Sequence, residues 1–124
     1  MIIGIGVDVV DIDRFQTVSM RTAAFAERVF TDHERFQRGG APRSIASMAA
    51  RFAAKEAVAK ALGVPAGLSW HEVEVSRDDG GRPRLALSGQ AADTAAARGI
   101  TDWHISLTHD AGVAIAYVIA ERQP

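Results

Sequence analysis

The sequence predicts an α+β fold in which a small antiparallel sheet packs against one long helix and several short helices. Three observations support this prediction. Isoleucine and valine alternate with other residues over 2–10, which is typical of a strand. Hairpin turn signals occur twice between short apolar runs, as D-D-G-G at 78–81 and H-D-A-G at 109–112. The longest helical pattern, Ser44–Leu62, then offers a surface on which hairpin-joined antiparallel strands can pack.

Length and composition indicate a single domain, 1–124, of ordinary globular type. The 124 residues are 48% hydrophobic and 23% charged, and 14 basic against 15 acidic side chains give a net charge of −1. This balance, without a basic helix interleaved with aromatics, predicts no nucleic-acid partner. The chain has no cysteine, which excludes disulfides and thiolate zinc sites and favours a reducing compartment, the cytoplasm. The apolar start reaches Asp8 too soon for a signal peptide or a membrane span.

Residues 2–10 are expected to form a buried strand. Positions 3, 5, 7 and 9 are all isoleucine or valine and share one face. The even-numbered positions share the other face and include Gly4, Gly6 and Asp8. This second face is therefore open just before Asp8.

Three short helices are expected next. Asp11 is placed to cap the first, which runs through Val18. The second covers roughly 23–30. Thr31 is placed to cap the third, with Glu34 at the capping-box position. These helices are expected to serve as packing units.

The long helix and two hairpins follow a glycine-containing loop at 38–42. Gly63 and Pro65 are expected to stop the long helix. The four strands expected beyond it are Trp70–Ser76, Pro83–Leu87, Trp103–Thr108 and Val113–Ala120. An alanine-rich helix, Ser88–Arg98, is expected between the hairpins, capped by Ser88 and ended by Gly99.

Asp8 is the first candidate functional residue, because a carboxylate within an apolar strand must be paired, hydrogen-bonded or metal-bound. The structural alternative is a strand-end acid that accepts backbone N–H bonds. A dinucleotide-binding loop is excluded, since Val9 stands where the third glycine of G-x-G-x-x-G belongs.

Glu56 and Lys60 form the second candidate, at i, i+4 on the face of the long helix that carries Phe52. By themselves they are typical of an exposed salt bridge of small value. The alanines around them would let another strand or a ligand approach closely. If Glu56 met Asp8, the two carboxylates would suit Mg²⁺, and Lys60 would suit phosphate oxygens.

A Ser106, His109 and Asp110 hydrolase triad is a weaker interpretation. The G-x-S-x-G elbow is missing, and adjacent residues of a strand point apart. The alternative for His109 is a polar turn residue. The arginines are spread through loops and helix ends, where a few suit an anionic ligand or an acidic partner protein.

Together these stretches resemble the holo-[acyl-carrier-protein] synthases, the short single-domain class of phosphopantetheinyl transferases. The matching stretches span almost the whole chain in family order and with family spacing. They are G-I-G-V-D at 4–8, F-A-E-R-V-F-T at 25–31, R-F-A-A-K-E-A at 51–57 with Lys60, G-R-P at 81–83 and I-S-L-T-H at 105–109. The resemblance implies the phosphopantetheinyl transferase fold, assembled as a homotrimer with active sites between subunits. It also implies Mg²⁺-dependent transfer of 4′-phosphopantetheine from coenzyme A to a serine of apo acyl carrier protein, which releases adenosine 3′,5′-bisphosphate.

The resemblance also implies residue roles. Asp8 and Glu56 align with the Mg²⁺ ligands, and Lys60 aligns with the lysine that contacts the pyrophosphate, so these three are the expected catalytic residues. The serine proton has three candidate acceptors, which are a water on the metal, Asp8 and Glu56. Arg14 and Arg28 fall where the family offers basic residues to the acidic recognition helix of the carrier protein.

Coenzyme A contacts are implied at a further set of positions. His109 aligns with the histidine of a family segment close to the coenzyme A site, and Arg43, Arg51, Arg82 and Pro83 fall near other contacts. Two other functions remain open. One is a non-catalytic trimeric coenzyme A-binding module, and the other is a metal-dependent phosphohydrolase that uses the same acids.

Overall fold

The fold is that of a computed structural model, which describes residues 1–22 and 24–124. Its strands are β1 (Ile2–Asp11), β2 (Val73–Arg77), β3 (Pro83–Leu87), β4 (Asp102–Asp110) and β5 (Val113–Glu121). Its α-helices are α1 (Ile12–Arg21), α2 (Ala24–Val29), α3 (Asp32–Arg35), α4 (Ile45–Ala61) and α5 (Gly89–Ala97). Ala23, the first residue expected in the second helix, lies outside the described residues. The α+β fold class is confirmed, with the strands divided between two antiparallel sheets.

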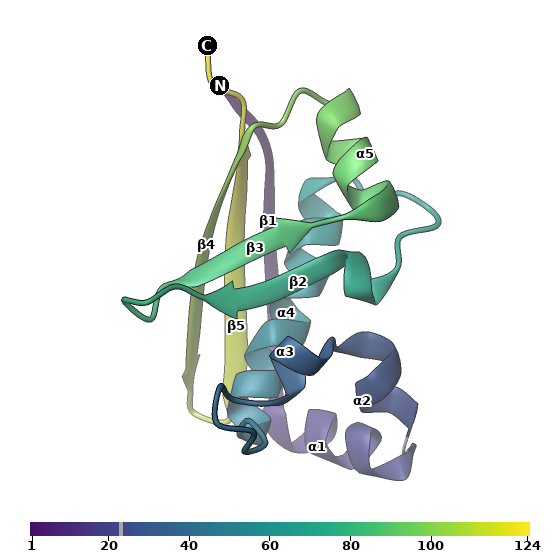
Figure 1. The fold of residues 1–124 in the computed structure, drawn as a ribbon, viewed down its shortest axis with the longest axis vertical. Helices are drawn as coiled ribbons and strands as arrows, with labels where there is room; N and C mark the ends of the chain where they lie inside the picture. The colour runs from purple at the N-terminus through teal and green to yellow at the C-terminus, as the bar shows by residue number, and fades with distance from the viewer. Residues whose placement is uncertain (23) are drawn as a thin grey trace.

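A three-stranded sheet of order β1-β5-β4 packs one face on α4 (Figure 1). Strand β5 is central, and its inward residues Ala114, Ala116, Val118 and Ala120 are fully buried. Asp8 lies on this inward face, because it is paired with Ala116. Asp8 is therefore turned towards the long helix.

Two glycines of β1 allow this helix to lie unusually close to the strand. A Cβ atom added to Gly6 would lie 2.7 Å from the carbonyl carbon of Ala57 and would overlap its oxygen. Gly4 stands in the same relation to Ala61. The face that the sequence left open before Asp8 is thus filled by the backbone of α4.

Local capping signals were predicted correctly at two helices. The Asp11 side chain accepts a 2.8 Å hydrogen bond from the Arg14 backbone N–H. Thr31 and Glu34 form the expected capping box of α3, and Ser44 caps α4. Gly63, at φ 81°, follows the last residues of α4 as the predicted stop.

The cap of α5 differs from the prediction. Ser88 occupies the cap position, but its side chain makes no capping hydrogen bond within the described chain. The Glu72 carboxylate instead accepts hydrogen bonds from the backbone N–H groups of Gln90 and Ser69. The Glu72 carboxylate thus takes the place of the Ser88 hydroxyl at the start of α5. Pairing of β2 with β3 brings Glu72 to this position, because Val73 is paired with Leu87.

The hairpins form with shifted boundaries. The strand predicted from Trp70 begins at Val73, because Trp70–Glu72 forms a turn of 3-10 helix, η1. Strands β4 and β5 pair as far as Asp110 and Val113, so His109 lies in a strand rather than in the turn. The turn itself is two residues long, with positive φ at both.

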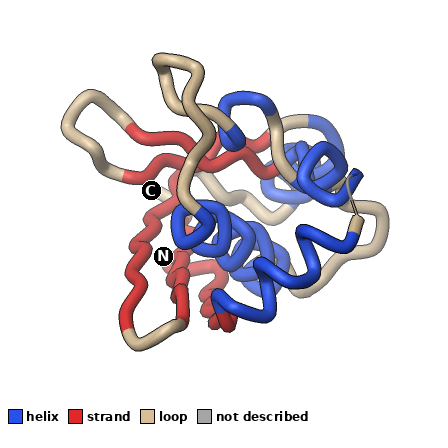
Figure 2. The backbone as a smooth tube through the Cα atoms, turned by 90° about the horizontal axis from the view of Figure 1, so that it is seen from below, coloured by secondary structure: helices blue, strands red, loops and turns tan. Residues whose placement is uncertain are grey.

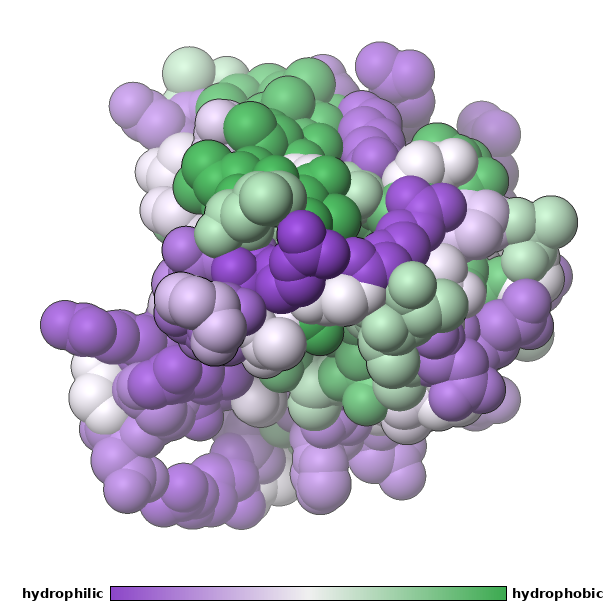
Figure 3. Space-filling model, turned by 90° about the horizontal axis from the view of Figure 1, so that it is seen from above, coloured by the Kyte–Doolittle hydropathy of each residue, from purple (hydrophilic) through white to green (hydrophobic). Residues whose placement is uncertain are grey.

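The outer face of the three-stranded sheet corrects the prediction of a buried β1. The expected alternation is present, but Ile5, Val7 and Val9 are 52%, 49% and 61% exposed, and Tyr117 of β5 beside them is 44% exposed. Figure 2 shows the helices gathered on the other side of this sheet. Figure 3, which looks onto the end where the termini lie, shows apolar side chains gathered next to a band of polar ones. The fold therefore leaves a large apolar sheet face without cover.

No helix among the described residues is long and apolar enough to cross a membrane.

Candidate active site

Asp8 and Glu56 line the same cleft, as the sequence analysis required for a shared site. The cleft has a volume of about 410 Å³ and lies between β1, α1 and α4. Asp8 reaches it from the inward face of β1, and Glu56 from α4. The close approach of strand and helix at Gly6 therefore brings together two carboxylates that lie 48 positions apart in the sequence.

Lys60 is held by the strand. Its Nζ donates hydrogen bonds of 3.0 Å to Asp8 Oδ1 and 3.0 Å to the carbonyl oxygen of Val7. Among the described residues, the ion-pair partner of Lys60 is Asp8 and not Glu56. The local i, i+4 salt bridge considered from the sequence is therefore wrong, and Lys60 is bonded to one of the two carboxylates that line the cleft.

The electrostatics of this cleft favour a bound cation. Burial raises the pKa of the Glu56 carboxyl, the Asp8 charge raises it further, and Lys60 lowers it. Two neighbouring carboxylates offer hard oxygen ligands, which Mg²⁺ accepts together with substrate phosphates and water. No group of three or more acidic, histidine or cysteine side chains within 1–22 and 24–124 forms a complete metal cage. The donor set thus fits a metal that a phosphate ligand helps to hold.

The remaining walls of the cleft are mostly apolar and aromatic, and Asp11 and Arg14 are the other charged residues that line it. The rings of Phe15 and Phe52 lie 5.6 Å apart, and those of Phe25 and Phe52 lie 6.1 Å apart. Val18 and Arg14 of α1 complete the rim. Arg14, which was predicted to meet a carrier protein, therefore lies at the carboxylate cleft, while Arg28 is exposed on α2.

A second site gathers arginines near the N-terminus of α4. Arg51 is buried, and its Nε donates a 3.3 Å hydrogen bond to the carbonyl oxygen of Val75. Burial, together with the positive charges of Arg43 and Arg77, lowers the pKa of Arg51 to about 10. An anion would relieve this repulsion.

Two donors at this arginine site lack an acceptor. Within the described residues, Arg43 Nε and Arg51 Nη2 are buried without a hydrogen-bond partner. The adjoining cleft, of about 450 Å³, is lined by Arg77 and His109 among others. Ser44 also lines it, at the N-terminus of α4, where the helix dipole favours a negative charge. Sequence reasoning identified Arg43, Arg51 and His109 but missed Arg77, which marks the end of β2.

Other predicted residues lie elsewhere. Arg82 and Pro83 line a third cleft of about 410 Å³ beside His104. The triad interpretation is wrong, because Ser106 and His109 lie on opposite faces of β4. Ser106 is paired with outward-facing Tyr117, whereas His109 is paired with buried Ala114.

Comparisons with known proteins agree with one another. Residues 4–118 match the family described as the 4′-phosphopantetheinyl transferase superfamily. A holo-[acyl-carrier-protein] synthase of Salinispora arenicola is 57% identical over 98% of this chain and 100% of its own. One of Streptomyces coelicolor is 55% identical over 97% and 98%. The Neisseria meningitidis synthase structure has a TM-score of 0.84 at 32% identity, covering 98% of this chain and 100% of that one. A Helicobacter pylori synthase structure in complex with coenzyme A has a TM-score of 0.81 at 33% identity, covering 94% and 99%.

Proposed function

This chain belongs to the 4′-phosphopantetheinyl transferase superfamily, and on that premise we propose that it acts as a holo-[acyl-carrier-protein] synthase. It transfers 4′-phosphopantetheine from coenzyme A to a serine hydroxyl of apo acyl carrier protein and releases adenosine 3′,5′-bisphosphate. The observation that carries this proposal is the meeting of Asp8 and Glu56 in one cleft, with Lys60 bound to Asp8.

The reaction is a displacement at the phosphorus that bears the pantetheine arm. The serine oxygen forms a bond to this phosphorus, and the bridging oxygen leaves with the adenosine bisphosphate. The serine proton passes to Glu56, which is the freer of the two carboxylates because Lys60 already holds Asp8 Oδ1.

Asp8 and Glu56 would hold Mg²⁺ between them, and the ion would neutralise charge that develops on the pyrophosphate oxygens. Lys60 supplies a positive charge at the same edge of the cleft for the departing phosphate. The arginine site near the start of α4 supplies unpaired donors for a further phosphate of coenzyme A.

The proposed assembly is a homotrimer. The carboxylate cleft and the cleft lined by Arg77 and His109, which we call the arginine-lined cleft, share no lining residue within one chain. One coenzyme A molecule would use both if the arginine-lined cleft of one subunit adjoined the carboxylate cleft of the next. The exposed apolar face of Ile5, Val7, Val9 and Tyr117 supports such contacts, because monomers rarely leave so much apolar surface uncovered.

The proposed partner is the acidic helix of an apo carrier protein, in the cytoplasm. A net charge of −1 gives no general attraction to an acidic surface, so recognition must be local. Arg14 at the rim of the cleft and Arg28 on α2 supply that local charge. Exposed Met20 and Val18 of α1 add apolar contact area beside them.

The test is mass spectrometry of an apo carrier protein incubated with coenzyme A, Mg²⁺ and the enzyme. The proposal predicts that the carrier protein gains one phosphopantetheine group and that adenosine 3′,5′-bisphosphate is released. Asp8→Asn and Glu56→Gln should lower the rate at least about a hundredfold, because a lost ligand weakens metal binding and charge stabilisation. Asp93→Asn, on the exposed side of α5, is the matched control.

Other outcomes would identify the alternatives. Coenzyme A binding without any product would indicate a binding module. Release of phosphate, or cleavage of coenzyme A in the absence of the carrier protein, would indicate a phosphohydrolase. Light scattering that finds a fully active monomer would overturn the trimer.

A further inference from the structure

Helix α4 carries two buried cations one turn apart, and both are bonded to the backbone of β2 or of the turn before it. Arg51 and Lys55 are 1% and 2% exposed. Lys55 Nζ donates hydrogen bonds of 2.6 Å to the carbonyl oxygen of Val73 and 2.9 Å to that of Trp70. This side of α4 is therefore attached by directional hydrogen bonds in addition to packing.

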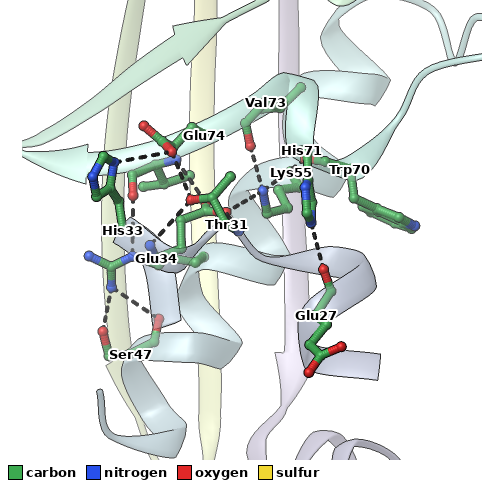
Figure 4. A network of polar contacts seen from close by, with 12 residues as sticks. Glu27, Thr31, His33, Glu34, Ser47, Lys55, Trp70, His71, Val73 and Glu74 are labelled. Atoms are coloured by element: carbon green, nitrogen blue, oxygen red, sulfur yellow. Dashed lines mark hydrogen bonds and ion pairs between the residues drawn. The ribbon is translucent and has the colours of Figure 1, made fainter. Parts of the chain in front are cut away.

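Glu34 of α3 is the carboxylate that completes this attachment (Figure 4). It is fully buried, and its Oε1 lies 2.7 Å from Lys55 Nζ. Oε1 also accepts a 3.0 Å hydrogen bond from the Thr31 N–H, and Oε2 accepts one of 2.8 Å from the Val75 N–H. We call Glu34, Lys55 and the backbone they bind at Trp70, Val73 and Val75 the α4 clamp.

The opposite side of α4 is restrained more weakly. Lys60 donates hydrogen bonds to Asp8 and Val7 of β1, but its side chain is 47% exposed, whereas Lys55 is buried. There the helix meets β1 through glycine and alanine, at Gly6 against Ala57 and Gly4 against Ala61. Such surfaces allow close approach but have few side chains that interlock, so they oppose rotation of the helix weakly. Lys55 directly precedes Glu56, and rotation of α4 about its axis would carry Glu56 away from Asp8.

We propose that Glu34 and Lys55 are positioning residues for the transfer reaction, which hold α4 in the rotation that brings Glu56 to Asp8. The inference rests on the proposed function. Stability alone does not account for the clamp, because well-packed apolar residues often replace a buried ion pair without loss of stability. Directional bonds from one ammonium group to three acceptors on three other elements instead specify a single helix orientation.

The decisive variant is the double substitution Glu34→Gln with Lys55→Met, which leaves neither charge buried alone. We expect it to fold, with a thermal midpoint close to that of the wild type, and to lose at least about tenfold in turnover. A second measurement is made without the carrier protein, so that no turnover occurs. Mn²⁺ is titrated into enzyme loaded with coenzyme A, free Mn²⁺ is followed by electron paramagnetic resonance, and its dissociation constant should rise about tenfold.

Glu74→Gln is the matched control. Glu74 lies on β2 and accepts a 2.7 Å hydrogen bond from the Thr31 hydroxyl, but it is not one of the residues of the α4 clamp. We expect wild-type turnover and Mn²⁺ binding from this variant. A defect of equal size would mean that any disturbance near Thr31 acts in the same way, and would overturn the proposal.

Lys55→Arg is the second test and decides the matter alone if the double variant does not fold. It keeps the charge beside Glu34, but a planar guanidinium cannot reproduce the three bonds of a compact ammonium. We expect reduced turnover and weaker Mn²⁺ binding in a folded protein. Wild-type values for both in either variant would show a purely structural pair. If the wild type itself modifies no carrier protein, the proposed function fails, whereas the Mn²⁺ titration still reports on the clamp.

Discussion

Replacing Gly6 with alanine should separate the two halves of the active site. The new Cβ would lie 2.7 Å from the carbonyl carbon of Ala57 and 3.2 Å from its Cα. It would also overlap the Ala57 carbonyl oxygen. These are backbone atoms in the middle of α4, so no side chain can turn aside. The helix or the strand must therefore retreat by about 1 Å, an overpacking that costs about 3 kcal/mol.

The consequences for stability and turnover follow from this displacement. For a domain of this size, about 3 kcal/mol lowers the thermal midpoint by about 10 °C. The retreat also separates Asp8 from Glu56, and a displacement of about 1 Å in an active site lowers turnover about a hundredfold. Thermal unfolding and the carrier-protein assay at a temperature well below the midpoint measure the two effects separately.

Gly39→Ala is the control for this experiment. Gly39 lies in the loop before α4 and has no atom of the described residues within 4 Å of an added Cβ. It should leave both the midpoint and the turnover unchanged. A thermal midpoint of Gly6→Ala within 2 °C of the wild type would correspond to about half a kcal/mol. If this variant also shows normal turnover, close approach of β1 and α4 does not set the geometry of the site.

Three further predictions test separate contacts. Lys60→Ala should lower turnover at least about tenfold but the free energy of unfolding by less than about 1 kcal/mol, because the ion pair of Lys60 with Asp8 is partly exposed. Thermal unfolding and the transfer assay measure the two effects. A large loss of stability with normal turnover would contradict the prediction. Glu72→Gln should destabilise the protein at pH 7. Backbone hydrogen bonds from Ser69, Gln90 and Ala91 lower the pKa of Glu72 from its ordinary 4.5, so its contribution is present above that pH and is lost as the pH falls through the lowered value. Denaturant unfolding of both proteins from pH 7 to pH 3 should show the difference shrinking, and a constant difference would argue against a charged cap. Arg14→Glu should raise the KM for apo carrier protein several-fold and leave the KM for coenzyme A nearly unchanged, and added salt should weaken the effect. Steady-state titration of both substrates measures the two constants. Equal changes in both KM values would place the docking face elsewhere.

Sequence reasoning succeeded where the determining contacts are local. The caps at Asp11 and Thr31 each involve a side chain and a backbone group three residues later, so a short stretch of sequence contains both partners. The cap of α5 was missed, because its partner Glu72 lies 18 residues before Gln90. The same limit applies to Trp70, where the turn of 3-10 helix is held in part by Lys55 from α4.

The candidate site divides in a similar way. Asp8, Glu56 and Lys60 were identified as types suited to the chemistry, but the pairing of Lys60 with Asp8 joins residues 52 positions apart. A periodic pattern also cannot tell which face of a strand is covered. Ile5, Val7 and Val9 were expected to be buried because they are apolar, and the fold leaves them exposed because the long helix α4 packs on the other face.

The pairing of the first strand with the last has a consequence for how the protein is made. Strand β5 is the central strand and the last element of the chain, and both β1 and β4 bond to it alone in their sheet. When β1 leaves the ribosome, it therefore has no strand to join until the residues of β5 have been synthesised. Contacts between such distant segments also slow folding, because a long loop must close before they form. During that interval the apolar residues of β1 have no partner, and removal of β5 by early termination should leave a chain that aggregates instead of a smaller folded domain.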